Sequence, residues 1–303
     1  MSREVDGTQC GIVAEVPSSH SICSRSIPGE RAVSIKDILV HVDDTRACEE
    51  RVRLTMRLAT RLGASVTGIL VLPSPAALMP PDDGAAAVTV ATWLAELEGA
   101  AEATGQEFLD RLSDAGLDGH WHLERGDAAF NIARRGRAMD LVVVGQHNPD
   151  LPNVLTAPED VVLSCGLPVL VVPFAGQFDD VGENAFIAWN SSSEAARSVH
   201  DALPLLTPRR KVTVVSINPD ANDEEIRDDL VGHLVRHGVD TEVETHVTKE
   251  LSPAELMLSL VADSGSDLIV MGAYGHSRLR EAVLGGMTHD MLRSMTVPVL
   301  MAH

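Results

Sequence analysis

The chain has 303 residues, of which 45% are hydrophobic and 3% aromatic, and its formal charge is −20 at pH 7. This composition supplies an aliphatic core and excludes a disordered chain, and the length suits one large domain or two of about 150 residues. The acidic balance argues against sequence-blind nucleic-acid binding and against anionic membrane surfaces, since both depend on Lys and Arg. We therefore expect no nucleic acid and no membrane among the partners.

The four cysteines are scattered and form no CxxC-type spacing, which argues against a zinc site or a redox dithiol. A reduced, intracellular protein is the simplest interpretation, and we expect a cytoplasmic location. No run of about 18 apolar residues occurs, so no transmembrane helix is expected. Residues 1–34 also lack the continuous apolar core of a secretory signal.

The pattern along the chain predicts strands that alternate with helices. Residues 1–34 mix Ser, Pro, Gly and charge without periodicity and predict a flexible arm. In the first half we expect strands at 35–42, 65–72, 120–124, 141–144 and 167–172, and helices at 48–62, 90–115, 127–138 and 157–165. In the second half the expected strands are 185–189, 211–217, 241–247, 268–271 and 297–301, and the expected helices are 190–206, 223–237 and 253–262. Such alternation predicts parallel sheets with helices on both faces.

The two halves repeat one another. Asp140–Gly145 parallels Asp267–Gly272, and Gly166–Val172 parallels Thr296–Ala302. An internal duplication of this length indicates two copies of one structural unit. We therefore predict two tandem, doubly wound, parallel-sheet α/β domains at residues 35–174 and 184–303, joined by a linker near 174–183.

A glycine-rich segment follows the buried strand predicted at 268–271. Ligands of parallel α/β sheets bind beyond the carboxyl ends of the strands. Gly272, Gly275, Gly285 and Gly286 lack a Cβ, so the backbone there can turn sharply, and free N–H groups near a helix start attract anions. The pattern predicts a phosphate on the N–H groups of the last three glycines and on the hydroxyl of Thr288.

This segment resembles the universal stress protein family in its tandem-domain form. The family's ATP-binding members carry Gly, two residues, Gly, nine residues, Gly, and then Ser or Thr, and this chain has Gly272-Ala-Tyr-Gly275, nine residues, and Gly285-Gly286. Two positions depart from the pattern: Gly286 stands at the hydroxyl residue, and Asn190 stands where the family places an acid at the end of the first strand. The resemblance covers residues 35–303.

The resemblance implies Rossmann-like domains of the adenine-nucleotide α-hydrolase type, and a site for ATP, ADP or AMP, with or without Mg²⁺, in residues 184–303. The base is then expected between Ile217 and Met271, and the ribose at Asn190. By position, the nucleotide would be lined by Ala188, Asn190, Ile217, Met271, Gly272, Gly275, Gly285, Gly286, Met287 and Thr288.

The first half keeps Asp43 at the ribose position but lacks the glycines. Two prolines in the stretch 146–153 remove N–H donors, and Asp150 would repel phosphate. The resemblance implies a degenerate universal stress domain, which is structural or binds a different ligand. In the family the last strand makes dimer contacts, so we expect the strands around Val169 and Val299 to join the two halves as a pseudo-dimer.

Histidines offer weaker candidates. His120 and His122 share one face of a strand, and His233 and His237 share one face of a helix, but neither pair has a third metal ligand in its pattern, so we expect polar surfaces and no metal site. Phosphate contacts remain open for three residues of the glycine segment: His276, Arg278 and Arg280.

Three functions are consistent with the sequence. The first is a cytoplasmic stress-response regulator that binds an adenine nucleotide, forms a homodimer and contacts further protein partners. We expect no catalytic residues and at most slow ATP hydrolysis, because the base, metal carboxylates and lysine of phosphoryl transfer are missing as a set. The second is a dimeric interaction scaffold without nucleotide. The third, an adenylyl-transferring enzyme, lacks an HxGH or SGGxDS-type signature.

Overall fold

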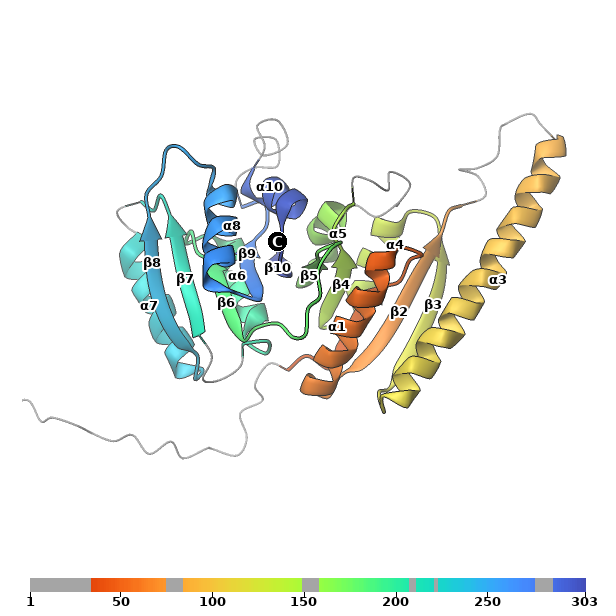
Figure 1. Cartoon of the computed structure of the whole chain (residues 1–303), viewed down its shortest axis with the longest axis horizontal. Coiled ribbons are helices and arrows are strands. Elements are labelled where there is room, and N and C mark those ends of the chain that lie inside the picture. Colours follow the sequence, from red (N-terminus) through yellow and green to blue (C-terminus); the bar gives the residue numbers. More distant parts are fainter. Residues whose placement is uncertain (1–33, 75–83, 149–157, 207–210, 221–222, 276–285) are drawn as a thin grey trace, which may run out of the picture. The chain divides into compact units, whose positions relative to one another are not determined.

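The computed structural model describes residues 34–74, 84–148, 158–206, 211–220, 223–275 and 286–303 (Figure 1). The arm predicted for residues 1–34 lies outside the described residues, apart from its last position. The described chain is an α/β structure in which helices cover both faces of a mostly parallel sheet. This confirms the predicted fold class of two tandem, doubly wound, Rossmann-like domains.

The described part of the N-terminal half contains five strands, and its central strands read as unbroken apolar runs because helices bury both of their faces. The strands are β1 (Asp37–His41), β2 (Ser65–Leu72), β3 (Gly119–Arg125), β4 (Leu141–Gly145) and β5 (Val169–Val172). The helices are α1 (Arg46–Leu62), α3 (Gly84–Asp114), α4 (Ala128–Gly136) and α5 (Pro158–Cys165). The side chain of Asp127 caps α4 by accepting a hydrogen bond from Phe130 N, as the sequence predicts.

The C-terminal half repeats this order. Its strands are β6 (Asn184–Ala188), β7 (Lys211–Ile217), β8 (Asp240–His246), β9 (Leu268–Gly272) and β10 (Val299–Ala302). Its helices are α6 (Ser193–Ala202), α7 (Asp223–Arg236), α8 (Pro253–Ser264) and α10 (Met287–Ser294). A capping box between Ser252 and Glu255 starts α8, and Gly265 ends it in the left-handed conformation, so local sequence alone fixes both ends of this helix.

One ten-stranded sheet runs through both halves in the order β3-β2-β1-β4-β5-β10-β9-β6-β7-β8. Strands within each half are parallel, and the halves meet where β5 and β10 pair antiparallel, with Val171 opposite Val299 and Val169 opposite Met301. This pairing confirms the predicted pseudo-dimer. It also means that the edge of β5 and the edge of β10 are both occupied within one chain.

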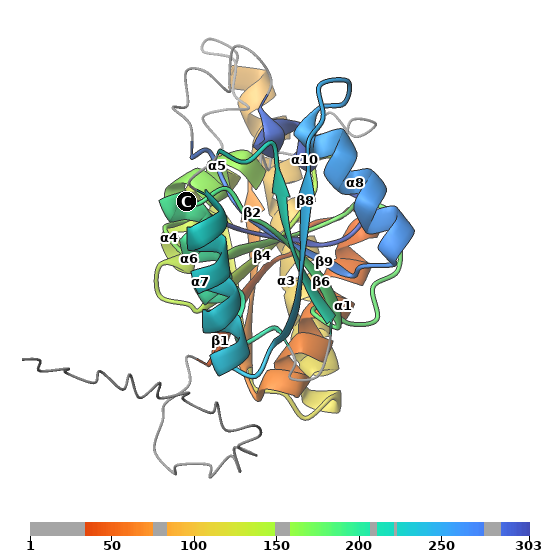
Figure 2. The ribbon, with the colours of Figure 1, turned by 90° about the vertical axis from the view of Figure 1, so that its left-hand side faces the viewer.

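Helices cover both faces of the sheet (Figures 1 and 2), and an apolar layer lies on each face. Residues of α1, α3, α6 and α7 form one layer with one face of the strands, and residues of α4, α5, α8 and α10 form the other. Successive strand residues alternate between the layers, as Leu39 and Val40 do. Each layer contains side chains of both halves, so the two halves share their core.

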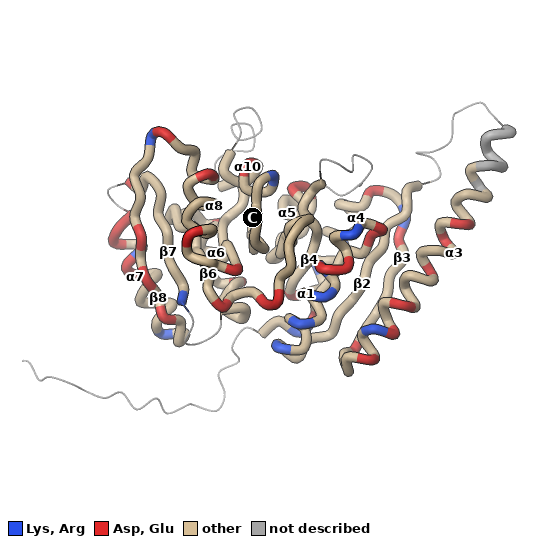
Figure 3. The backbone as a smooth tube through the Cα atoms, viewed as in Figure 1, with Lys and Arg blue, Asp and Glu red and all other residues tan. Residues whose placement is uncertain are grey.

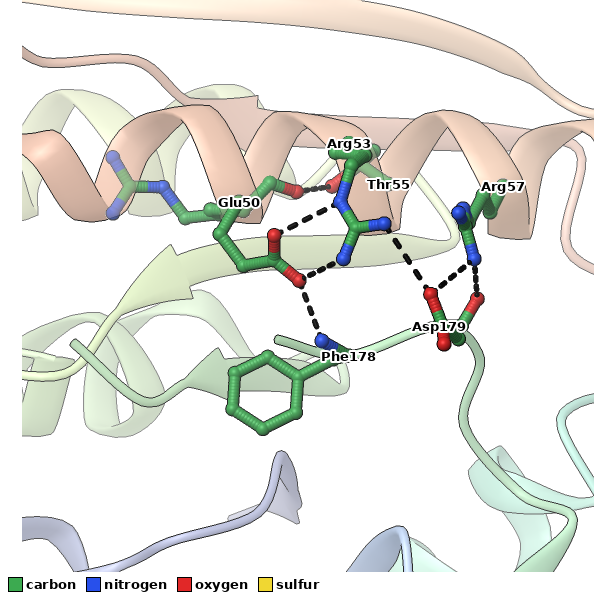
Figure 4. A network of polar contacts seen from close by, with 7 residues as sticks. Glu50, Arg53, Thr55, Arg57, Phe178 and Asp179 are labelled. Carbon is green, nitrogen blue, oxygen red and sulfur yellow. Dashed lines mark hydrogen bonds and ion pairs between the residues drawn. The ribbon is translucent and has the colours of Figure 1, made fainter. Parts of the chain in front are cut away.

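The linker between β5 and β6 is held against α1 (Figure 4). Glu50 on α1 accepts a hydrogen bond from Phe178 N at 2.5 Å and pairs with Arg53. Asp179 in the linker pairs with Arg53 at 3.3 Å and with Arg57 at 2.8 Å. Because each of these contacts repeats about one turn along α1, the linker follows the helix.

Helix α1 contains five arginines, although the chain has a net negative charge (Figure 3). The last of them also contacts the linker. Arg61 pairs with Asp180 at 2.8 Å and donates to the carbonyl oxygens of Val181 and Leu205. Since Leu205 lies just beyond α6, Arg61 ties helices of the two halves together. These contacts are partly exposed, so each is worth at most about 1 kcal/mol.

Candidate functional site

A cavity of ≈340 Å³ opens at the carboxyl ends of β6, β7 and β9 in the C-terminal half. Most residues that the sequence placed at a ligand site line this cavity: Ala188, Asn190, Ile217, Met271, Gly272, Gly275, Met287 and Thr288. Gly286 is the N-cap of α10, directly before Met287. Gly285, together with His276, Arg278 and Arg280, lies outside the described residues. The parallel sheet therefore brings together segments that are about 100 residues apart in the chain.

Backbone strain concentrates at this cavity. Three described residues other than glycine have a positive φ: Ser191 at 57°, Asn218 at 50° and Tyr274 at 57°. They follow β6, β7 and β9 respectively, so each of the three strands that ends at the cavity is followed by a left-handed residue. Such a conformation costs about 1–3 kcal/mol and is typical of ligand sites, where the surrounding structure maintains it.

Asn190 and Ser192 form a local turn at the start of α6. The Oδ1 atom of Asn190 accepts hydrogen bonds from the Ser192 backbone N at 3.3 Å and from its hydroxyl at 2.8 Å. Ser192 in turn caps α6 by accepting from Ala195 N. The side-chain oxygen of Asn190, the residue expected at the ribose, is therefore engaged in the turn. The side-chain NH₂ group remains as a donor to a ligand hydroxyl.

The two described glycines of the motif have different surroundings. A Cβ on Gly272 would lie 2.5 Å from the backbone N of Ala195, so this glycine allows α6 to pack directly against β9. The three atoms nearest to a Cβ on Gly275 belong to side chains, with Glu194 Oε2 at 3.1 Å and Ser192 Oγ at 3.4 Å. Gly272 is thus required by close contact with backbone, whereas a Cβ at Gly275 would first meet side chains.

The start of α10 provides donors for an anion. Its N-cap is Gly286, which has no side chain to satisfy the first N–H groups of the helix. The hydroxyl of the buried Thr288 accepts a hydrogen bond from Tyr274 N at 3.1 Å and so holds the turn after β9 against α10. A threonine hydroxyl can also donate one hydrogen bond, which suits a phosphate oxygen.

Sequence reasoning did not identify several cavity residues as ligand-lining. Pro253 and Met257 of α8, and Asp220 and Asp223 next to β7, also line the cavity. Pro253 and Met257 reach the cavity because of how α8 packs in the fold, and no sequence motif predicts this. Buried polar atoms without a hydrogen-bond partner among the described residues occur beside the cavity at Trp189 Nε1 and Ser191 Oγ.

These features fit a nucleotide: an apolar part formed by Ile217, Met257 and Met271, amide and hydroxyl groups, and a helix start without a side-chain cap. Among the described lining residues there is no Lys, Arg or His. Phosphate charge would therefore be met there by backbone N–H groups, the α10 dipole and any bound Mg²⁺.

Comparison with known proteins identifies the family. Residues 34–173 and 190–303 match the model described as the universal stress protein family. The chain belongs to this family. Universal stress protein Slr1230 of Synechocystis sp. is 30% identical over 146 residues, which are 47% of this chain and 49% of that protein. The chain thus spans about half the length of this curated relative.

Solved universal stress proteins share the fold over nearly the whole chain. One from Archaeoglobus fulgidus has a TM-score of 0.72 at 14% identity and covers 89% of this chain and 96% of its own. A putative universal stress protein from Pseudomonas aeruginosa has a TM-score of 0.55 at 17% identity and covers 88% and 93%. At these identities the similarity establishes the fold of the family.

The N-terminal universal stress domain has a larger cavity, of ≈710 Å³, in a different position. It lies between the start of α1, the ends of β1 and β4, and residues 173–177 of the linker. Asp43, the residue at the family's ribose position, lines it, but its carboxylate is already engaged. Its Oδ1 accepts from the Thr45 N and hydroxyl, and its Oδ2 accepts from Arg51 at 2.7 Å.

Arg51 is the reason for this difference between the domains. Its side chain is 2% exposed, and its Nε donates to the carbonyl oxygen of His41 at 2.7 Å. A Cβ on Gly145 would lie 2.2 Å from Arg51 Nη1, so the guanidinium fills the space beside the end of β4. Arg51 and Ser198 occupy matching positions, each six residues after the N-cap of its helix, Thr45 or Ser192. The C-terminal domain therefore has a small side chain where the N-terminal domain has a guanidinium.

Burial and the neighbouring Arg51 charge lower the pKa of His41 to about 4, although Asp43 partly opposes this effect. The unfolded chain takes up a proton on this histidine near pH 6.5, and the folded chain does so only near pH 4. The contribution of His41 to the free energy of unfolding is therefore fully present above pH 6.5. It is lost as the pH decreases towards 4, by about 3 kcal/mol in total. Chemical denaturation of wild type and His41→Gln between pH 7 and pH 4 should give a flatter profile for the variant. Parallel profiles would show that folding does not lower the pKa of His41.

Of the other histidine candidates, His120 and His237 are exposed, and His122 and His233 are half-buried. His120 and His122 occupy β3 at an edge of the sheet. His233 lies with its ring centroid 4.9 Å from that of His200 and 4.5 Å from that of His237. Burial and these two neighbours lower the pKa of His233. Within the described ranges, no three His, Cys, Asp or Glu residues are arranged to hold a metal ion.

No helix in the part of the chain that the structure describes is long and apolar enough to cross a membrane.

Proposed function

We propose that this protein is a stress-response regulator that binds ATP, or a related adenine nucleotide, in the cavity of its C-terminal domain. The observation that supports it most is the coincidence of the glycine motif with three left-handed, non-glycine residues around one cavity. Three strand ends held in strained turns favour a preformed site over a surface hollow left by chance packing.

The placement of groups suggests how a nucleotide would lie. The base fits among Ile217, Met271 and Met257, and the ribose lies near the side-chain amide of Asn190. The phosphates would extend towards Gly275 and the start of α10, where N–H groups and the helix dipole favour negative charge. The assignment of Arg278 and Arg280 to the phosphates remains a sequence prediction.

The site supports binding more than chemistry. Its described residues include two carboxylates, Asp220 and Asp223, but no histidine or lysine that could act as base or charge partner. We therefore propose that any ATP hydrolysis is slow, and that the nucleotide acts by changing contacts with partner proteins. An association of two chains would need a surface other than β5 and β10, because those two edges pair with each other.

Equilibrium titration with ATP, ADP, AMP and cyclic AMP, each with and without Mg²⁺, tests this function. One solved universal stress protein is in complex with cAMP. We expect one nucleotide per chain with a dissociation constant below about 1 mM, equivalent to about −4 kcal/mol. If no nucleotide binds in that range, the proposed function fails, and the interaction scaffold is the function left to test.

A further inference from the structure

The two-turn helix α10 links the candidate nucleotide cavity to the N-terminal domain. Its first residues, Met287 and Thr288, line the cavity. Its later residues Met291 and Leu292 are buried in an apolar layer that also contains Val144 and other residues of the N-terminal domain. A helix of eight residues is marginal by itself, so its position is set by what it packs against.

A buried amide of the N-terminal domain contacts this helix. Gln146 is 7% exposed, and its Nε2 donates to the carbonyl oxygen of Leu292 at 2.9 Å. Because α10 ends at Ser294, Leu292 belongs to the last turn, whose carbonyl groups have no partner inside the helix. Gln146 therefore supplies a donor that the helix itself lacks.

The remaining bonds of Gln146 fix its own position. Its backbone N donates to Val172 O at 2.8 Å, and its Oε1 accepts from Phe174 N at 3.2 Å. The amide is thus held between the end of β4, the start of the linker and α10. A second contact lies nearby, where His289 of α10 is 4.0 Å from Glu159 of α5.

The contact of Gln146 with α10 has no counterpart at the matching position of the C-terminal half. Gln146 follows Gly145 at the end of β4, and Ala273 follows Gly272 at the end of β9. The backbone bonds correspond, since Ala273 N donates to Ala302 O just as Gln146 N donates to Val172 O. Alanine, however, has no side-chain donor, so position 273 cannot make the corresponding hydrogen bond to α5.

We infer that Gln146 is a positioning residue for the nucleotide site of the other domain. The N-terminal domain, whose own ribose position is closed by Arg51, holds the far end of α10 and so places the N–H groups at its near end. This inference rests on the proposed function, but its effect on α10 can be measured without nucleotide. It gives the degenerate domain a part in ligand affinity.

The test compares three full-length variants. Gln146→Leu removes the donor and the acceptor at similar size, and Gln146→Glu keeps an acceptor for Phe174 N but loses the donation to Leu292. Asn131→Leu is the matched control: Asn131 is 5% exposed and donates to Arg125 O and Asp127 O in the same domain, away from α10. Hydrogen–deuterium exchange of residues 287–294 without nucleotide is measured first, and ATP titration follows.

Both Gln146 variants should increase exchange of α10 and raise the ATP dissociation constant about threefold to tenfold, as the loss of one buried hydrogen bond predicts. Asn131→Leu should lower overall stability without either effect. Equal exchange of α10 in Gln146→Leu and Asn131→Leu would overturn the inference. Faster exchange with unchanged affinity would reduce Gln146 to a stabilising contact. If wild type binds no nucleotide, the proposed function fails, and the inference about the nucleotide site fails with it, while the exchange data still decide whether Gln146 holds α10.

Discussion

Replacement of Gly275 by Asp should weaken ATP binding by about two orders of magnitude. The new carboxylate would lie beside the proposed phosphates, and two like charges about 5 Å apart near a protein surface repel by about 3 kcal/mol, or roughly a hundredfold in affinity. The backbone tolerates the change, because Gly275 is not among the described residues with positive φ. Calorimetric titration of wild type and variant measures the difference.

Gly275→Ala is the control for this experiment. It adds the Cβ without the charge, and the atoms nearest to that Cβ belong to the side chains of Glu194, at 3.1 Å, and Ser192, at 3.4 Å. We expect its ATP affinity to stay within a fewfold of wild type. Equal losses in both variants would indicate a steric effect, and unchanged affinity in Gly275→Asp would show that the nucleotide binds elsewhere.

Replacement of Arg51 by Met should destabilise the protein by about 3 kcal/mol. The substitution leaves Asp43 with its charge in a site where its side chain is 15% exposed, and removal of one partner of a buried ion pair typically costs 3–5 kcal/mol. Burial alone would raise the pKa of Asp43, but Arg51, His41 and Thr45 together lower it. Urea denaturation at pH 7 measures the loss of stability.

Arg57→Met provides the comparison on the same helix. Arg57 is 45% exposed, and its partner Asp179 is 86% exposed, so we expect a loss of less than about 1 kcal/mol. The double variant Arg51→Met/Asp43→Asn should recover part of the stability, because it removes the uncompensated charge. Equal losses for Arg51→Met and Arg57→Met would contradict a buried pair at the N-terminal site.

The duplicated fold could be predicted from sequence because its signals are local. The runs at 141–144 and 268–271 are apolar on both faces, and they form the buried parallel strands β4 and β9. The family resemblance predicted that the last strands join the two halves as a pseudo-dimer, which is confirmed, and the structure adds that β5 and β10 pair antiparallel. The ends of elements differ by a few residues, as for α6, which stops at Ala202 and not at residue 206.

The details of the sites were less accessible, because they depend on contacts between distant residues. Arg51 appears in the sequence as one of five arginines on α1, and only its fit beside Gly145 shows that it is buried. Gln146 is an ordinary polar residue after a strand until α10 packs next to it. The left-handed residues Ser191, Asn218 and Tyr274 carry no glycine signal, so sequence patterns do not mark their strain.

The central claim is that nucleotide binds in the cavity of the C-terminal domain and not in that of the N-terminal domain. Hydrogen–deuterium exchange of the full-length protein with saturating ATP, compared with the free protein, tests this most directly. We predict protection confined to the ends of β6, β7 and β9 and to the start of α10, with residues 41–51 unchanged. Protection of residues 41–51, or no protection around residues 188–192 and 286–290, would contradict the assignment of the site.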